Sequence, residues 1–214
     1  MRKLLIAAAV IAGQSPASAE TVIAAFGDSL TQGYGLVPED GFVAQLQNWL
    51  DEAGADVRLI NAGVSGDTTA GGLARIGWAL TPEVDGMIVT LGGNDLLRGL
   101  DPAQAKTNLT GILDAAEDAE VEVLLVGLQA PGNFGPEYKT AFDAIYPDLA
   151  AEYGTGYFRN FFAGLVPEGE GGTSVSLQKY FLPDGLHPNA EGVSRIVEGI
   201  GPAVLELVER VEAE

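Results

Sequence analysis

Three residues of this 214-residue chain have types and spacing suited to nucleophilic attack and proton transfer. Ser29 lies in the stretch FGDSLTQGY, directly after a short apolar run, and His187 follows Asp184 by three residues in LPDGLHPNAEG. An aspartate at that spacing can hydrogen-bond one imidazole nitrogen, which leaves the other free to accept a hydroxyl proton. A serine hydroxyl is an effective nucleophile only beside such a base.

His187 is the only histidine, so any serine–histidine chemistry must use it. Ser29 is the one serine after residue 19 that follows a predicted strand in a turn able to expose its side chain; the others are Ser65, Ser174, Ser176 and Ser194. The chain has no cysteine, which excludes a thiol nucleophile and a thiolate metal site. With one histidine a transition-metal site is not expected, and we predict no metal and no cofactor.

Strand-like apolar runs alternate with helix-like segments along the chain. The runs are short and mostly continuous, as expected of strands covered on both faces. They span residues 21–26, 57–63, 86–92, 121–128 and, more weakly, 156–162.

The intervening segments have helical spacing of apolar residues. In residues 41–54 the pattern ends at Gly54, and the next segment starts at Asp67, a residue type that caps helices. A third helix is predicted after Asp101, with Pro102 in its first turn. The last two predicted helices span residues 136–154 and 189–211, and Asn189 is the expected N-cap of the final one.

This alternation predicts a three-layer α/β/α sandwich around a mainly five-stranded parallel sheet. Reactive loops of such folds lie at the carboxyl ends of the strands. Four polar motifs follow predicted strands in that way, and a fifth cluster precedes the last helix. They read FGDSL, NAGVSGDTT, TLGGNDLLRG, QAPGNFGPEY and LPDGLHPNAEG.

Four of these motifs, in this order, resemble the motif blocks of the GDSL, or SGNH, hydrolase family. They are GDSL, a glycine in NAGVSGDT, GGND and DGLHPN, and the similarity runs from about residue 21 to the C-terminal helix. The stretch APGNFGPEYKTAFDAIYPDLA also resembles the bacterial periplasmic branch of acyl-CoA thioesterase I, lysophospholipase L1 and arylesterase. The resemblance implies the flavodoxin-like fold of that family and ester hydrolysis through an acyl-enzyme.

The resemblance also implies a role for each matching residue. Ser29 would be the nucleophile, His187 the general base and then acid, and Asp184 the group that orients His187. The backbone N–H groups of Ser29 and Gly63 and the side-chain amide of Asn94 would form the oxyanion hole. A glycine allows close approach of backbone to substrate, and an amide supplies a donor for developing negative charge.

Other residues near these motifs have less specific expected roles. Asp28 and Asp95 are expected to shape their loops by hydrogen bonding and are assigned no chemistry. Leu128, Phe134 and Tyr138 lie near the fourth loop and are candidates to line an apolar groove for the acyl chain, although they could equally be core residues.

The substrate class expected from the resemblance is a small aryl or acyl ester. A carbohydrate acetylesterase of the same family is the alternative, and a non-catalytic binding module on the same fold is the alternative from another class. A third, a metalloenzyme or nucleotide-binding protein, lacks the metal ligands and phosphate-binding glycine motifs it would need. The absence of a G-x-S-x-G elbow also separates this chain from α/β-hydrolases.

Residues 1–19 have the pattern of a secretory signal peptide: a basic start, a short apolar run and a small-residue cleavage site. Its removal would leave one domain, residues 20–214, with 9 basic and 30 acidic residues and a formal charge of −21. That charge disfavours nucleic acid, anionic membranes and polyanionic substrates such as acyl-CoA. We therefore predict a periplasmic or secreted monomer that acts on a small-molecule ester and is not membrane-anchored.

Overall fold

The fold is built on a five-stranded parallel sheet. The computed structural model describes residues 20–166 and 177–213, and the predicted signal peptide, residues 1–19, lies outside this part. The strand order is β2-β1-β3-β4-β5, and every adjacent pair is parallel. The strands are β1 (Thr21–Gly27), β2 (Val57–Gly63), β3 (Gly86–Thr90), β4 (Glu122–Val126) and β5 (Gly156–Phe158).

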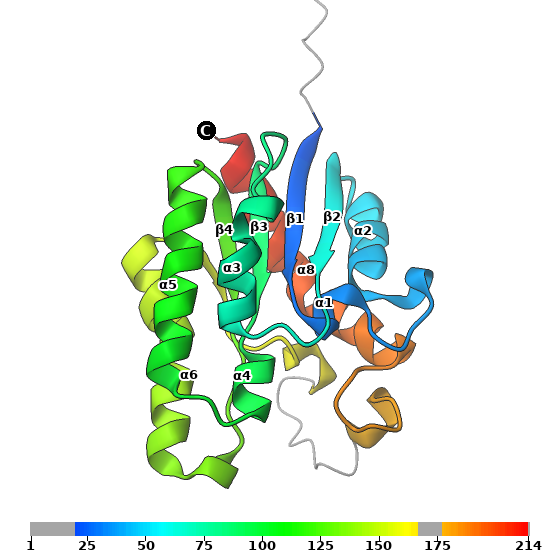
Figure 1. Ribbon diagram of the computed structural model, residues 1–214. Helices are drawn as coiled ribbons and strands as arrows, with labels where there is room; N and C mark the ends of the chain where they lie inside the picture. The colour runs from blue at the N-terminus through cyan, green and yellow to red at the C-terminus, as the bar shows by residue number, and fades with distance from the viewer. Residues whose placement is uncertain (1–19, 167–176, 214) are drawn as a thin grey trace, which may run out of the picture.

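Helices cover both faces of the sheet (Figure 1). Helices α2 and α8 pack against each other on one face, and α3, α5 and α6 form a row on the other. This confirms the predicted three-layer α/β/α sandwich. The helices are α1 (Ser29–Gln32), α2 (Phe42–Ala53), α3 (Thr69–Ala79), α4 (Gly93–Leu97), α5 (Pro102–Asp118), α6 (Pro136–Tyr153) and α8 (Ala190–Glu212), with 3₁₀ turns at η1 (Pro38–Asp40), η2 (Gly132–Phe134), η3 (Ala163–Leu165) and η4 (Gln178–Tyr180).

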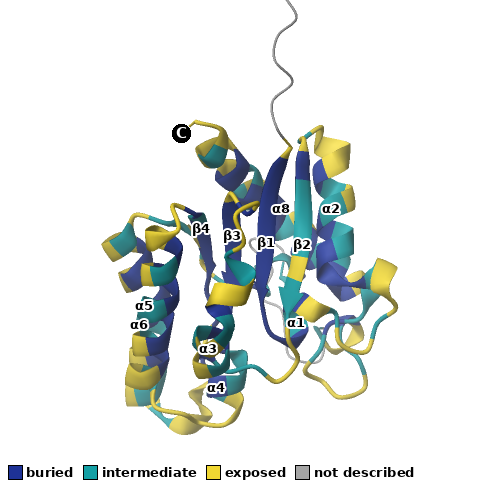
Figure 2. Ribbon diagram, turned by 45° about the horizontal axis from the view of Figure 1, so that its top comes forward, coloured by how far each residue is buried: buried dark blue, intermediate teal, exposed yellow. Residues whose placement is uncertain are grey.

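Burial differs between the central and edge strands. All seven residues of β1 are buried, whereas β2, at one edge, has a single buried residue (Figure 2). The buried apolar side chains of strands and helices form one continuous core. Because β1 and β3 are adjacent and fully buried, the loops that follow them are anchored in the most deeply buried part of the sheet.

Most predicted helix boundaries are confirmed. Gly54 ends α2 in the left-handed region at φ +81°, Asp101 caps α5 through the Ala103 N–H, and Asn189 caps α8. The prediction for α3 is wrong by one residue, because Thr68 is its N-cap. The neighbouring Asp67 instead forms an ion pair with a side chain of α3.

Three strands end earlier than the apolar pattern predicts. β3 stops at Thr90, β4 at Val126 and β5 at Phe158, because the chain then turns into the loops at the carboxyl edge. In the described residues, no helix has the length and apolar character needed to cross a membrane.

Candidate active site

Ser29 lies in a tight connection between a buried strand and a short helix. β1 ends at Gly27, and the Asp28 carboxylate then accepts the Leu30 N–H at 3.0 Å and so caps α1, of which Ser29 is the first residue. A Cβ on Gly27 would lie 2.7 Å from the Thr90 carbonyl oxygen, so only glycine fits there. The local sequence therefore places Ser29 at the carboxyl edge of the sheet, as predicted.

His187 and Asp184 lie on one tight turn before α8. The turn is closed by an antiparallel bridge between Phe181 and Pro188 and by a hydrogen bond from the Leu182 N–H to the His187 carbonyl oxygen at 2.8 Å. Gly185 supplies the left-handed conformation that the turn needs, at φ +69°. This arrangement fixes the aspartate and the histidine relative to each other through local contacts alone.

The structure brings the three residues together across 158 positions of sequence. His187 Nε2 lies 2.9 Å from Ser29 Oγ, and His187 Nδ1 lies 2.7 Å from Asp184 Oδ2. The bond to the His187 side chain, and further bonds from the backbone N–H groups of His187 and Leu186, lower the pKa of Asp184 to about 2. An ionised Asp184 favours the proton on Nδ1, so Nε2 is the atom able to accept a proton from Ser29.

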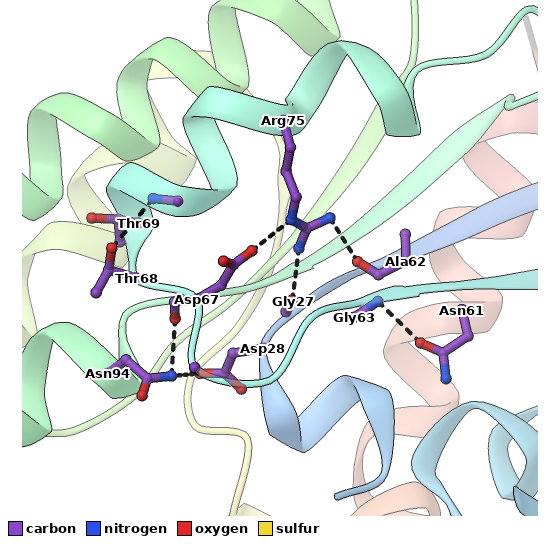
Figure 3. A network of polar contacts seen from close by, with 12 residues as sticks. Gly27, Asp28, Asn61, Ala62, Gly63, Asp67, Thr68, Thr69, Arg75 and Asn94 are labelled. Carbon is purple, nitrogen blue, oxygen red and sulfur yellow. Dashed lines mark hydrogen bonds and ion pairs between the residues drawn. The ribbon is translucent and has the colours of Figure 1, made fainter.

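The amide nitrogen of Asn94 makes two hydrogen bonds within the protein. Its Nδ2 donates to Asp28 Oδ2 at 3.1 Å and to the Asp67 carbonyl oxygen at 2.9 Å (Figure 3). Burial raises the pKa of Asp28 to about 6, although its bonds to Leu30 and Asn94 act in the opposite direction. Asn94 is therefore held in place next to Ser29, with both amide hydrogens on acceptors of the protein itself.

The structure does not place Gly63 as the resemblance implies. Its N–H donates to Asn61 Oδ1 at 3.0 Å, so this donor is already used within the protein (Figure 3). A Cβ on Gly63 would lie 2.4 Å from the Gln32 backbone nitrogen, so this glycine is required for packing against the end of α1. The assignment of Gly63 to the oxyanion hole is therefore corrected.

Gly66, three residues later in the same motif, differs from Gly63 in backbone conformation and in the use of its N–H. It adopts φ +84°, and its carbonyl oxygen accepts from Arg98 Nη2 at 2.9 Å. Within residues 20–166 and 177–213, no hydrogen bond engages its N–H. The motif NAGVSGDTT contains both glycines, and the sequence gives no sign of which one leaves its N–H free.

A cavity of about 770 Å³ opens at the Ser29 side chain. His187 and Asn94 line it, and most of its wall is apolar. The apolar residues come from α4, the loops after β4 and β5 and the segment before α8, and they include Leu96, Leu97, Leu128, Phe162, Leu177 and Phe181. Leu128 therefore lies where it was predicted.

Phe134 and Tyr138 lie outside this cavity, so their assignment to the groove is wrong. Phe134 packs against Tyr138, with ring centroids 5.0 Å apart, and covers Gly99. Tyr138 stacks in turn on Phe142 at 6.1 Å. The four-residue spacing on α6 puts Tyr138 and Phe142 in one aromatic row, whereas Lys139 reaches the cavity wall.

A buried polar network confirms the predicted loop-shaping role of Asp95. Its carboxylate accepts the Thr69 N–H at 2.8 Å and the Thr69 hydroxyl at 2.6 Å. The Thr69 hydroxyl accepts in turn from Asn108 Nδ2 at 2.9 Å. The network joins α4, which carries Asn94, to α3 and α5.

The site combines a serine, an imidazole and an ionised carboxylate, hydrogen-bonded in that order, at the carboxyl edge of a parallel sheet. This arrangement is typical of serine hydrolases. The family is given by comparison with known proteins. The sequence model of the GDSL-like Lipase/Acylhydrolase family matches residues 25–195. The chain belongs to this family and is an ester hydrolase of the GDSL, or SGNH, type.

Curated relatives match over most of their length. An esterase from Pseudomonas aeruginosa, named TesA, is 39% identical over 97% of this chain and 100% of its own. A protein from Escherichia coli K12 named thioesterase 1/protease 1/lysophospholipase L1 is 33% identical over 90% of this chain and 86% of its own. Among solved structures, the SGNH-hydrolase esterase AlinE4 is 41% identical with a TM-score of 0.71, over 89% of this chain and 97% of that one.

Proposed function

We propose that the protein hydrolyses small aryl or acyl carboxylic esters through a covalent acyl-enzyme on Ser29. The contact of 2.9 Å between Ser29 Oγ and His187 Nε2, continued from Nδ1 to Asp184, is the observation that carries this proposal. The named esterase and thioesterase relatives support the ester chemistry but leave the substrate open.

The geometry supports a two-step mechanism. Ser29 Oγ attacks the ester carbonyl carbon while its proton passes to His187 Nε2, and the imidazolium then gives that proton to the departing alkoxide or phenolate. Water attacks the resulting acyl-Ser29 ester, with His187 again taking the proton, and the carboxylic acid leaves as Ser29 Oγ regains it. The ionised Asp184 stabilises the imidazolium in both steps.

Three donors are proposed for the oxyanion of the tetrahedral intermediate. The Ser29 N–H lies in the first turn of α1, where it has no partner within the helix. The Gly66 N–H replaces Gly63 in this role. The Asn94 amide would exchange one of its two present acceptors, Asp28 Oδ2 or the Asp67 carbonyl, for the oxyanion.

The cavity and the charge of the chain favour a neutral ester with an apolar acyl or aryl group. The apolar part of the wall around Ser29 is mostly leucine and phenylalanine, which would take up a hydrocarbon chain or ring. The formal charge of −19 for the whole chain would slow the approach of a polyanionic thioester. Export to the periplasm or the medium, after cleavage near residue 19, remains part of the proposal.

The test is hydrolysis of a chromogenic ester series from acetyl to long acyl, together with one thioester. Ser29→Ala and His187→Ala are each expected to lower kcat/KM at least ~10⁴-fold, because each removes part of the proton-transfer unit. Ser194→Ala, on α8, is the matched control and is expected to keep the wild-type rate. Near-normal activity in either active-site variant would overturn the mechanism, and activity confined to acetyl esters would favour the acetylesterase alternative.

A further inference from the structure

Arg75, on α3, contacts three segments at the carboxyl edge of the sheet at once. Its Nη2 donates to the Gly27 carbonyl oxygen at 2.9 Å and its Nη1 to the Ala62 carbonyl oxygen at 2.9 Å (Figure 3). Its Nε donates to Asp67 Oδ2, and the guanidinium lies 4.2 Å from the centroid of the Phe26 ring. None of these contacts is made to Ser29, His187 or Asp184.

Each acceptor of Arg75 belongs to a segment that carries a group of the proposed mechanism. Gly27 is two residues before Ser29, and its carbonyl oxygen also accepts the Val64 N–H at 3.0 Å. Ala62 leads into the loop that contains Gly66. The third acceptor, Asp67, accepts the Asn94 amide on its own carbonyl oxygen. The guanidinium therefore connects the start of the serine turn, the glycine loop and the residue that holds Asn94.

The three contacts are specific for arginine. A guanidinium is planar and directs its donors in a fixed fork, so three acceptors bound to it are held at fixed relative positions. A lysine ammonium is a compact charge on a flexible stem and cannot span three acceptors in one plane. Side-chain exposures of 22% for Arg75 and 18% for Asp67 show that this pair is largely shielded, where such hydrogen bonds are stronger than at the surface.

We propose that Arg75 is a positioning residue for the oxyanion-stabilising donors of the active site. It fixes the distance between the Ser29 turn and the loop of Gly66 and Asp67, and through the Asp67 carbonyl it fixes Asn94. This inference rests on the proposed esterase function. It assigns Arg75 no contact with the substrate, so its loss should weaken transition-state stabilisation more than substrate binding.

The test compares Arg75→Lys and Arg75→Met with Arg58→Lys and Arg58→Met. Arg58 is a matched control because it also donates to two partners, Glu20 and Glu83, but from the opposite end of β2. Active sites are counted by the burst of nitrophenolate that a p-nitrophenyl phosphonate releases when it phosphonylates Ser29. The kcat per counted site and the KM for a chromogenic ester are then measured, together with the Tm of each variant.

Both Arg75 variants are expected to lose about 10- to 100-fold in kcat per counted site, because a shift of about 1 Å in catalytic groups has effects of this size. KM should stay within about threefold of the wild-type value, and the Arg58 variants should keep the wild-type kcat. If Arg75→Met does not fold, Arg75→Lys decides the question.

Two results would overturn the inference. A kcat per counted site within about twofold of the wild-type value in the folded Arg75 variants, whatever their Tm, would show that Arg75 only stabilises the fold. A rise in KM with unchanged kcat would show a role in substrate binding instead. A wild-type protein that hydrolyses no ester and releases no burst would contradict the proposed function itself, which is a separate outcome.

Discussion

The two halves of the active site are built in contrasting ways. The proton-transfer half, His187 and Asp184, lies on one exposed turn, and its side chains are 20% and 36% exposed. The donor half centres on Asn94 and is held by buried groups, with Asp28 and Asp95 each only 2% exposed. The turn of the first half is closed by hydrogen bonds between residues at most about ten positions apart. The second half is assembled from β1, the loop after β2, α3 and α4.

The contrast follows from what each half must do. The imidazole must deliver a proton to a leaving group and later accept one from water, so it has to be reachable from solvent. Donors for an oxyanion are effective when they are fixed in advance in a shielded, low-dielectric site. Buried networks give that rigidity at the cost of burying carboxylates such as Asp28 and Asp95.

The largest effect in this comparison is expected from Asp184→Asn. The substitution keeps an oxygen for the backbone N–H groups but can turn an amide NH₂ toward His187 Nδ1, which favours the tautomer that has its proton on Nε2. That tautomer cannot accept the Ser29 proton, so we expect kcat to fall about 10⁴-fold, as for the equivalent change in a serine protease triad. Steady-state kinetics on a chromogenic ester give the measurement.

Asp148→Asn is the control for this substitution, because Asp148 also pairs with a basic side chain, Lys106, at an exposed position. It should leave kcat unchanged. The Tm of both variants should stay close to that of the wild type, since neither aspartate is buried. An Asp184→Asn variant with more than a tenth of wild-type kcat would show that the exposed half is not the proton-transfer unit.

The next largest effect is expected in the donor half, from Asn94→Ala. Removing one oxyanion donor typically lowers turnover about 10²- to 10³-fold, and we expect a loss of that size in kcat with little change in KM. Asn61→Ala is the matched control, because Asn61 accepts the Gly63 N–H. That N–H is the one we excluded from the oxyanion hole. It should change kcat by less than about twofold. A clear increase in kcat for Asn61→Ala would instead restore Gly63 to the oxyanion hole.

The sequence predicted the two halves with unequal success. Ser29, His187 and Asp184 could be found because their residue types are rare or reactive and their motifs follow predicted strands. The alternation of strands and helices also sufficed for the five-stranded sheet, since its periodicity is a local property. Asn94 was found through the resemblance, but not its bonds to Asp28 and Asp67.

The remaining features depend on contacts that no local pattern encodes. Gly63 and Gly66 share one motif, and they are distinguished by the bond from the Gly63 N–H to Asn61 and by the packing of Gly63 against the end of α1. The prediction for Phe134 and Tyr138 was wrong because a loop position near the sheet edge does not tell which way the first turn of α6 faces. Arg75 had no signal at all: an arginine in a helix is ordinarily a solvated residue, and its three acceptors come from distant segments.

A smaller effect is expected in the pH dependence of activity. In acid, kcat/KM should fall, because the His187 imidazolium cannot accept the Ser29 proton. Asp28, with a pKa of about 6, would also gain a proton in this range. Asp28→Asn separates the effect of His187 from that of Asp28. The variant should have a lower maximal kcat/KM but should still lose activity in acid. If kcat/KM of this variant were constant between about pH 5 and 8, the loss of activity in acid would be due to Asp28 rather than His187.

A last effect, on stability rather than on turnover, is that the two halves should respond to pH with opposite sign. The raised pKa of Asp28 means that the folded protein binds its proton more tightly than the unfolded chain, for which the reference value is 3.8. Its contribution to the free energy of unfolding is therefore full below about pH 4 and is lost as the pH rises through about 6, a change of up to about 3 kcal/mol. The lowered pKa of Asp184 acts in reverse, and its contribution is lost only as the pH falls from about 4 toward 2.

Urea unfolding of the wild type and Asp28→Asn between about pH 4 and 7.5 measures the contribution of Asp28 to the free energy of unfolding. The wild type should lose stability relative to the variant as the pH rises, because ionisation of a buried carboxyl is unfavourable when its two acceptor bonds do not fully replace water. A difference that is independent of pH would mean that Asp28 is ionised at the same pH in the folded and unfolded chain. The donor half would then be as well solvated as the turn that carries Asp184, and the contrast between the two halves would not hold.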